Sequence, residues 1–239
     1  MQPFATGGIV RYFAITRPVP RARPRLKRYA MPRNASIFIA AAVAIVAIAG
    51  GMWSARMLFE GGNRTLSLQK ATALTPPRPL PAFSLIDDAG AAFEPSRLKQ
   101  RWSLLFFGFT HCPDVCPTTL GMLAQTEKLL ADLPTELRPQ VVLVSVDPQR
   151  DTPQQLASYV KFFSKSFTGV TGTPAAIDEF TQAMGVPVAI SPQSNGDYTV
   201  DHSAAIFLVN PDGALRALFS TPHTPAVIAA DYRQLIAQH

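Results

Sequence analysis

A stretch of 18 residues without a charged side chain, Ser36 to Trp53, limits what this chain can fold into more than any other feature. Its sequence, SIFIAAAVAIVAIAGGMW, is long enough to cross the hydrocarbon core of a bilayer as a helix. A helix of that length in a soluble core is expected to have a polar face, and this stretch has none. The sequence therefore predicts a transmembrane anchor over residues 35–55.

The basic charge of the chain is concentrated in front of this segment. Residues 1–33 hold eight Arg and Lys and no acidic residue, whereas the rest of the chain holds 14 basic and 16 acidic residues. The positive-inside rule therefore places the N-terminus in the cytoplasm and the remainder outside. Because the positive charge belongs to a proline-interrupted arm, residues 1–34, and not to a folded face, it does not predict nucleic-acid binding.

Two other interpretations of this region stay open. Met31 can be the true start, followed by a signal peptide cleaved after Ala47-Ile48-Ala49, although the apolar run continues past that site to Trp53. The acid-free arm can also be a mitochondrial transit peptide, although its prolines disfavour an amphipathic helix. The first location expected is the bacterial inner membrane, with the C-terminal domain in the periplasm. The alternative is the mitochondrial inner membrane, facing the intermembrane space.

The rest of the chain divides into a tether and one domain. Residues 56–81 end in a proline-rich run, which predicts a tether because proline cannot pack in a helix or a central strand. Residues 82–239 alternate between strand and helix patterns, which predicts a mixed α/β, thioredoxin-like domain. The expected strands are 83–86, 103–109, 140–147, 204–209 and 214–219, the expected helices are 117–133, 152–163, 173–185 and 224–237, and Asn195-Gly196 predicts a hairpin turn.

The only two cysteines of the chain lie where the buried strand 103–109 meets the next helix. Pro117 suits the first helical position, which puts Cys116 near the N-cap, so the helix dipole is expected to lower the thiol pKa values. Three residues separate Cys112 from Cys116, one more than is usual in thiol-disulfide oxidoreductases. This spacing suits two sulfurs binding one metal ion, while a disulfide remains possible. A purely structural disulfide would close a very small loop and stabilise little.

The donor atoms point to a soft metal ion. Two thiolates select copper(I), zinc or iron–sulfur, and a chain with two cysteines cannot supply a four-thiolate site. Copper is the expected ion, as copper(I) with copper(II) as the alternative. Copper(I) accepts three ligands, so one imidazole would complete the site. In a thioredoxin-like fold, the loop that enters the strand beginning near Ala204 faces the cysteine loop, which favours His202. The candidates for this imidazole ligand are His111, His202, His223 and His239.

Three motifs in order, FFGFTHCPDVCPTTL, VSVDPQRDTP and YTVDHSAAIFLVNPDG, resemble the Sco/SenC family over residues 80–239. The resemblance implies a thioredoxin-like fold that binds copper through Cys112, Cys116 and His202. It also implies a role in building the dinuclear copper site of cytochrome c oxidase subunit II, as copper donor, thiol reductant or both. The implied partners are that subunit, other periplasmic copper chaperones and thioredoxin-like reductants.

Three aspartates near these motifs are further candidates. Asp114 lies between the cysteines, Asp201 is expected to orient His202, and Asp147 ends a strand near the site. Each has an alternative interpretation as an ordinary solvated or structural aspartate. Two rival functions also remain: a metal-independent thiol-disulfide oxidoreductase, which needs Cys112 and Cys116 and does not need His202, and a redox or copper sensor.

Overall fold

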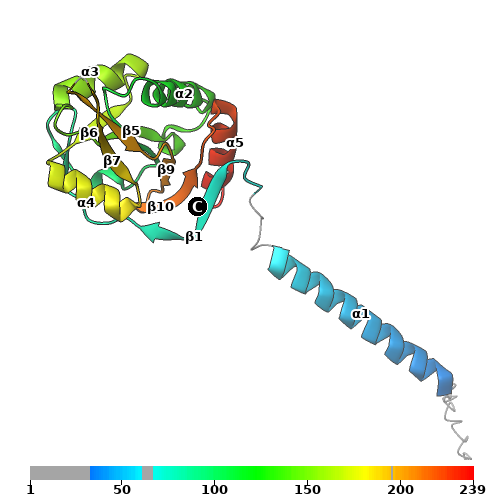
Figure 1. The fold of residues 1–239 in the computed structure, drawn as a ribbon. Helices are drawn as coiled ribbons and strands as arrows, with labels where there is room; N and C mark the ends of the chain where they lie inside the picture. Colours follow the sequence, from blue (N-terminus) through cyan, green and yellow to red (C-terminus); the bar gives the residue numbers. More distant parts are fainter. Residues whose placement is uncertain (1–32, 61–66, 195) are drawn as a thin grey trace, which may run out of the picture. The chain divides into compact units, whose positions relative to one another are not determined.

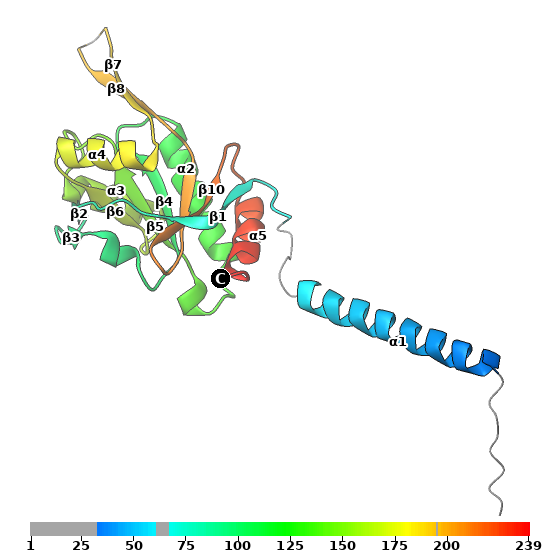
Figure 2. The ribbon, with the colours of Figure 1, turned by 90° about the horizontal axis from the view of Figure 1, so that it is seen from below.

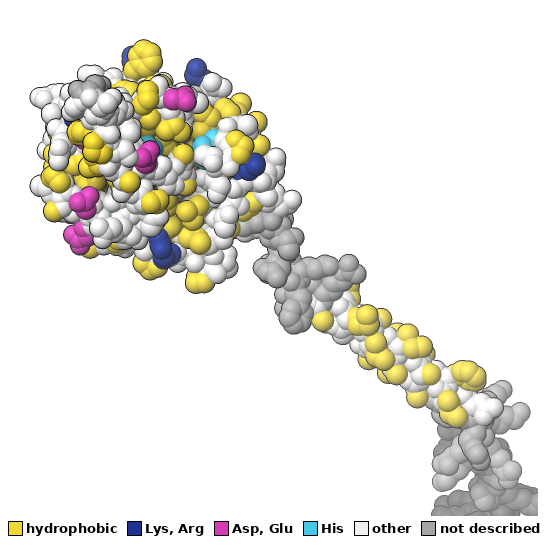
Figure 3. Space-filling model, in the orientation of Figure 1, with side chains coloured by type: hydrophobic (Ala, Val, Ile, Leu, Met, Phe, Trp, Pro, Cys, Tyr) yellow, Lys and Arg dark blue, Asp and Glu magenta, His cyan; other side chains and the backbone are white. Residues whose placement is uncertain are grey.

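The computed structural model describes residues 33–60, 67–194 and 196–239, which belong to two compact units divided after Arg64. In the first unit, helix α1 (Arg33–Glu60) contains a span of 19 residues, Ile37–Ala55, long and apolar enough to cross a membrane. Hydrophobic side chains follow this helix along its length (Figure 3). Residues 1–32 of the basic arm lie outside the described residues.

An eight-stranded sheet forms the centre of the second unit (Figure 1). Strands β4 and β5 are parallel and buried at every position but Gln140, because their apolar runs face helices on one side and more core on the other. The sheet order is β1-β10-β9-β4-β5-β6-β2-β3. The strands are β1 (Ala71–Pro79), β2 (Leu85–Asp87), β3 (Ala92–Phe93), β4 (Ser103–Gly108), β5 (Gln140–Ser145), β6 (Thr168–Thr171), β9 (Ile206–Val209) and β10 (Ala214–Phe219).

Two helices of this unit begin where the sequence indicates. Thr152 and Thr173 each accept a backbone N–H through the side chain, and each precedes a proline, so α3 and α4 start at the predicted caps. Helix α2 packs beside α3 and α5. The helices are α2 (Val115–Leu129), α3 (Pro153–Phe163), α4 (Pro174–Met184) and α5 (Pro225–Ile236), with short 3-10 turns at Pro95–Leu98 and Thr135–Leu137.

A separate hairpin stands outside the main sheet. Strands β7 (Val188–Pro192) and β8 (Tyr198–His202) pair only with each other among the described residues, and His202 lies opposite Val188. Figure 2 shows this hairpin projecting from the body of the domain. The turn predicted at Asn195-Gly196 lies at its tip, where Gly196 has a φ of 83° and Asn195 falls outside the described residues.

The prediction of a tether through residue 81 is wrong for residues 71–79. This segment forms β1, which pairs with β10 at the edge of the sheet. Prolines are tolerated there because an edge strand leaves one side of its backbone unpaired. The buried Asp231 carboxylate of α5 accepts three backbone N–H groups just ahead of this pairing, from Gln69, Lys70 and Ala71, at 2.8–2.9 Å. These bonds attach the start of the domain to its last helix.

Helix α2 and strand β6 also differ from the prediction. Helix α2 begins at Val115, two residues before the predicted start, and ends at Leu129, although apolar spacing continues to Leu133. The extra apolar residues lie in turns ahead of Pro134, and Leu130 is buried there without being helical. Strand β6 was not predicted, because its four residues include Gly169 and lack a long apolar run.

Candidate metal centre

The cysteine loop follows strand β4 and lies at the carboxyl end of that strand. Its last residue, Gly108, packs so closely against α2 that a Cβ atom there would lie 3.0 Å from the Cys116 Sγ and 3.0 Å from the Phe106 ring. After Gly108 the chain turns through the loop holding Cys112 and enters α2 at Val115. The two cysteines therefore lie at the carboxyl end of a fully buried strand, where the first turn of the helix begins.

The structure brings together Cys112, Cys116 and His202. One ligand atom from each lies within 4.8 Å of the other two, and the Cys116 Sγ is 3.4 Å from the His202 Nε2. Three donors around one ion, at metal–ligand distances of about 2.3 Å, would be separated by about 4 Å. The group therefore fits a soft metal ion with little rearrangement. Among the described residues this group holds three donors and no fourth.

His202 has one ring nitrogen available as a ligand. Its Nδ1 lies 3.0 Å from the Ser203 carbonyl oxygen, and because that oxygen can only accept, Nδ1 carries the proton and Nε2 keeps its lone pair. The Phe106 and Phe109 rings form T-shaped pairs with the imidazole, at centroid distances of 6.1 and 5.9 Å. Burial lowers the pKa of His202, although the Ser203 carbonyl and Asp201 act in the opposite direction.

The two cysteines have different surroundings. Cys116 is fully buried, and burial raises the pKa of its thiol well above the ordinary value, with the Cys112 sulfur adding to the effect. The expectation that the pKa of Cys116 is lowered is therefore wrong, because desolvation is the largest influence on it. Cys112 lies at the edge of a cavity of about 230 Å³ and accepts the Cys116 N–H at 3.4 Å. Cys112 is thus the sulfur that solvent or a partner reaches.

The remaining histidines have other contacts. His111 is exposed and bonds the Thr110 hydroxyl through Nδ1, at 3.0 Å. The Nε2 of His223 donates to the Ala204 carbonyl at 2.8 Å, and His239 lies near Asp212 and the Trp102 ring. None of these three belongs to the donor group found among the described residues.

The three aspartates named from the sequence do not share one role. Asp201 accepts the Ser191 hydroxyl across the hairpin at 3.1 Å, so the Ser203 carbonyl, and not Asp201, fixes the His202 tautomer. Asp114 and Asp201 line the cavity beside Cys112, and the Asp114 side chain makes no capping bond to α2. Asp147 is buried outside the cavity lining and accepts the Tyr198 hydroxyl at 2.7 Å.

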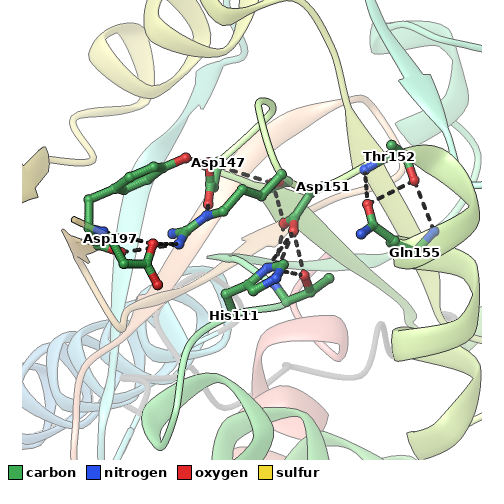
Figure 4. A network of polar contacts seen from close by, with 10 residues as sticks. His111, Asp147, Asp151, Thr152, Gln155 and Asp197 are labelled. Atoms are coloured by element: carbon green, nitrogen blue, oxygen red, sulfur yellow. Dashed lines mark hydrogen bonds and ion pairs between the residues drawn. The ribbon is translucent and has the colours of Figure 1, made fainter. Parts of the chain in front are cut away.

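A further aspartate supports the cysteine loop. Asp151 is buried, and its carboxylate accepts the Thr110 N–H at 3.1 Å, the Thr110 hydroxyl at 2.5 Å and the Ser145 hydroxyl at 2.6 Å (Figure 4). Burial raises the pKa of Asp151, and these hydrogen bonds oppose the increase. No local sequence pattern marks Asp151 as part of the site, because Thr110, its partner in the cysteine loop, lies 41 residues away.

Comparison with known proteins decides the family. Residues 72–237 match the family model described as SCO1/SenC, which is more than half of the chain. The chain belongs to the SCO1/SenC family. A Stutzerimonas stutzeri protein whose name describes copper binding is 41% identical over 164 residues, covering 67% of this chain and 79% of that protein. The mitochondrial SCO2 homolog of Bos taurus is 36% identical over 156 residues, covering 65% of this chain and 59% of its own length.

A solved SCO1/SenC structure confirms the fold. The crystal structure of Arabidopsis thaliana ScoI with copper bound is 34% identical, with a TM-score of 0.63, and the match covers 66% of this chain and 98% of that one. The predictions of the Sco/SenC family and of a mixed α/β, thioredoxin-like domain are therefore both confirmed. This SCO1/SenC chain spans less than two thirds of the length of the cattle protein.

Proposed function

We propose that the chain binds copper(I) through Cys112, Cys116 and His202. The observation that carries this proposal is the convergence of two sulfurs and an unprotonated imidazole nitrogen within 4.8 Å. Thiolates select soft cations, and a structural zinc site would need a fourth protein ligand. The donor group of the described residues holds three, a number that copper(I) accepts. The copper-bound Arabidopsis relative supports the same choice of metal.

Copper is cargo in this proposal, and the chain is a metallochaperone. The acceptor we propose is the dinuclear copper site of cytochrome c oxidase subunit II, and family membership is the support for it. Other periplasmic copper chaperones and thioredoxin-like reductants are the further partners we propose. The burial of the donors suggests an order of release: the half-buried His202 leaves first, Cys112 exchanges next at the cavity, and the fully buried Cys116 exchanges last.

The apolar helix α1 supports a location at a membrane. We propose the bacterial inner membrane, with the N-terminus in the cytoplasm and the copper domain in the periplasm. Support comes from the apolar span Ile37–Ala55, the basic residues before it and the Stutzerimonas relative. Because some relatives are mitochondrial, the mitochondrial inner membrane, with the copper domain in the intermembrane space, is the alternative location.

The ligand assignment is tested on the full-length chain in detergent. Copper(I) affinity is measured by competition with a chromophoric chelator for the wild type, His202→Ala and His111→Ala. We expect His202→Ala to lose affinity at least tenfold, because it removes a ligand, which costs no less than the 10- to 100-fold seen for residues that merely support one. His111→Ala, which removes an exposed histidine next to Cys112, is the matched control and should bind as the wild type does. Equal affinity in all three proteins would exclude His202 as a ligand.

A second function, thiol-disulfide exchange without metal, is favoured by one observation. Cys112 lines the surface cavity and receives the N–H of Cys116, while Cys116 is close enough to resolve a mixed disulfide. In that reaction the two thiols become a disulfide as a partner disulfide is reduced to two thiols. The rate should not depend on His202. Reduction of an oxidised subunit II copper-site peptide by metal-free His202→Ala, at the wild-type rate, would support this second role.

A further inference from the structure

The hairpin that carries His202 is attached to the domain through few contacts. Strands β7 and β8 form their own two-stranded sheet, so no main-sheet ladder among the described residues holds them. Most of their side chains are exposed or half-buried, and Val200 is the one that is buried. The orientation of β8 must therefore be set by contacts between side chains of the hairpin and the body of the domain.

Arg150, in the loop between β5 and α3, makes a concentrated set of such contacts. Its Nη1 donates to the Asp197 carboxylate at 3.0 Å and to the Tyr198 carbonyl at 3.1 Å, and its guanidinium lies 3.8 Å from the centre of the Tyr198 ring. Its Nε donates to Asp147, which also accepts the Tyr198 hydroxyl. Asp147 and Asp197 lie in one run of polar contacts in Figure 4.

The same arginine is connected to the imidazole through one aromatic ring. The guanidinium carbon lies 5.8 Å from the centre of the Phe109 ring, and that ring lies 5.9 Å from the His202 ring, edge to face. Tyr198 and His202 are the first and last residues of β8. Strand β8 is thus held by Arg150 at one end and by the main chain leading to β9 at the other, and Phe109 fills the space between them.

We infer that Arg150 is a positioning residue for His202. By fixing the far end of β8, it holds the imidazole nitrogen against the two sulfurs and so sets how readily His202 leaves the metal. The inference rests on the proposed role of His202 as a copper ligand. Arg150, the arginine of the DPQRDTP motif, thus controls copper release through the hairpin and not through contact with the metal ligands.

The test compares Arg150→Gln and Arg150→Lys with Arg233→Gln in the full-length chain. Arg233 is the matched control, because it also joins a carboxylate, Asp132, to a backbone carbonyl, at the distant helix α5. Two quantities are measured: amide hydrogen exchange of residues 188–202 in the metal-free protein, and the rate at which bound copper(I) passes to an excess of chelator. Copper stoichiometry is measured alongside.

Arg150→Gln is expected to raise both rates by about tenfold, the effect of losing hydrogen bonds that involve a charged group. Exchange in the main sheet and the stoichiometry should stay at wild-type values. Arg150→Lys keeps the charge but loses the planar guanidinium and its stacking on the Tyr198 ring. Both rates should therefore lie between those of the wild type and those of Arg150→Gln. Arg233→Gln should change neither rate. A purely structural role for Arg150 would alter overall stability and leave the ratio of hairpin exchange to main-sheet exchange unchanged.

Unchanged hairpin exchange and release in Arg150→Gln would overturn the inference. If that variant does not fold, because Asp147 is left buried without its cation, Tyr198→Leu removes the ring and hydroxyl from the hairpin side and keeps the Arg150–Asp147 pair. Wild-type rates in Tyr198→Leu would also overturn it. Failure of the proposed function has a different signature: His202→Ala binds copper as the wild type does, while hairpin exchange still reports whether Arg150 holds β8.

Discussion

The substitution Gly108→Ala tests whether close packing behind the site controls the position of the Cys116 sulfur. The added Cβ would lie 3.0 Å from the Cys116 Sγ, 3.0 Å from the Phe106 ring and 3.2 Å from a Leu143 methyl carbon. Ordinary contacts of this kind are no shorter than about 3.4 Å, and overpacking a filled core costs about 1–3 kcal/mol. All three neighbours are fully buried, so none can turn toward solvent to relieve the contact.

Two changes should follow in the full-length chain. The melting temperature of the domain, measured by circular dichroism, should fall by about 3–10 °C. Copper(I) affinity, measured by chelator competition, should fall by about 10- to 100-fold, as is usual when the support of a metal ligand is disturbed. The affinity falls because the buried sulfur moves by a few tenths of an ångström away from His202.

Gly121→Ala is the matched control, since Gly121 lies inside α2 with no atom within 4 Å of an added Cβ. Alanine is the better helix former by about 1 kcal/mol, so this variant should be slightly more stable and bind copper as the wild type does. If Gly108→Ala kept both the wild-type melting temperature and the wild-type affinity, the account of the Cys116 position would be refuted.

Three further outcomes are expected. Replacing Asp231 with Ala should lower the free energy of unfolding by about 3 kcal/mol in urea titrations, because three backbone N–H groups lose a charged acceptor. Thr152→Ala should cost about 1 kcal/mol in the same assay, because it removes the capping box of α3. Copper(I) affinity should rise at least tenfold per pH unit near pH 7, because the raised pKa of Cys116 keeps its thiol protonated in the metal-free protein and binding releases that proton. A pH-independent affinity would contradict this last expectation.

The fold and the donor group could be predicted because their signals are local. An uninterrupted apolar run marks β4, and a threonine followed by a proline marks the starts of α3 and α4. Two cysteines at the end of a buried strand restrict the site to one place in the fold. The choice of His202 needed only the topology that these elements imply.

The features that could not be predicted depend on distant contacts or on burial. Strand β1 was read as a tether because its prolines are unfavourable in general, and only its place at the sheet edge makes them tolerable. The contacts of Arg150 join residues 47 and 48 positions apart. The pKa of Cys116 is raised mainly by desolvation, and the complete burial that causes this is a property of the packed domain.

The composition of the outermost strands affects how copies of this domain behave when they are concentrated together. At one margin, β1 has Pro76, Pro77 and Pro79, which cannot donate a hydrogen bond to an incoming chain. At the other margin, β3 is two residues long and too short to template an addition. Sheets with such blunted margins resist growing by strand addition, so this domain should stay unaggregated at high local density.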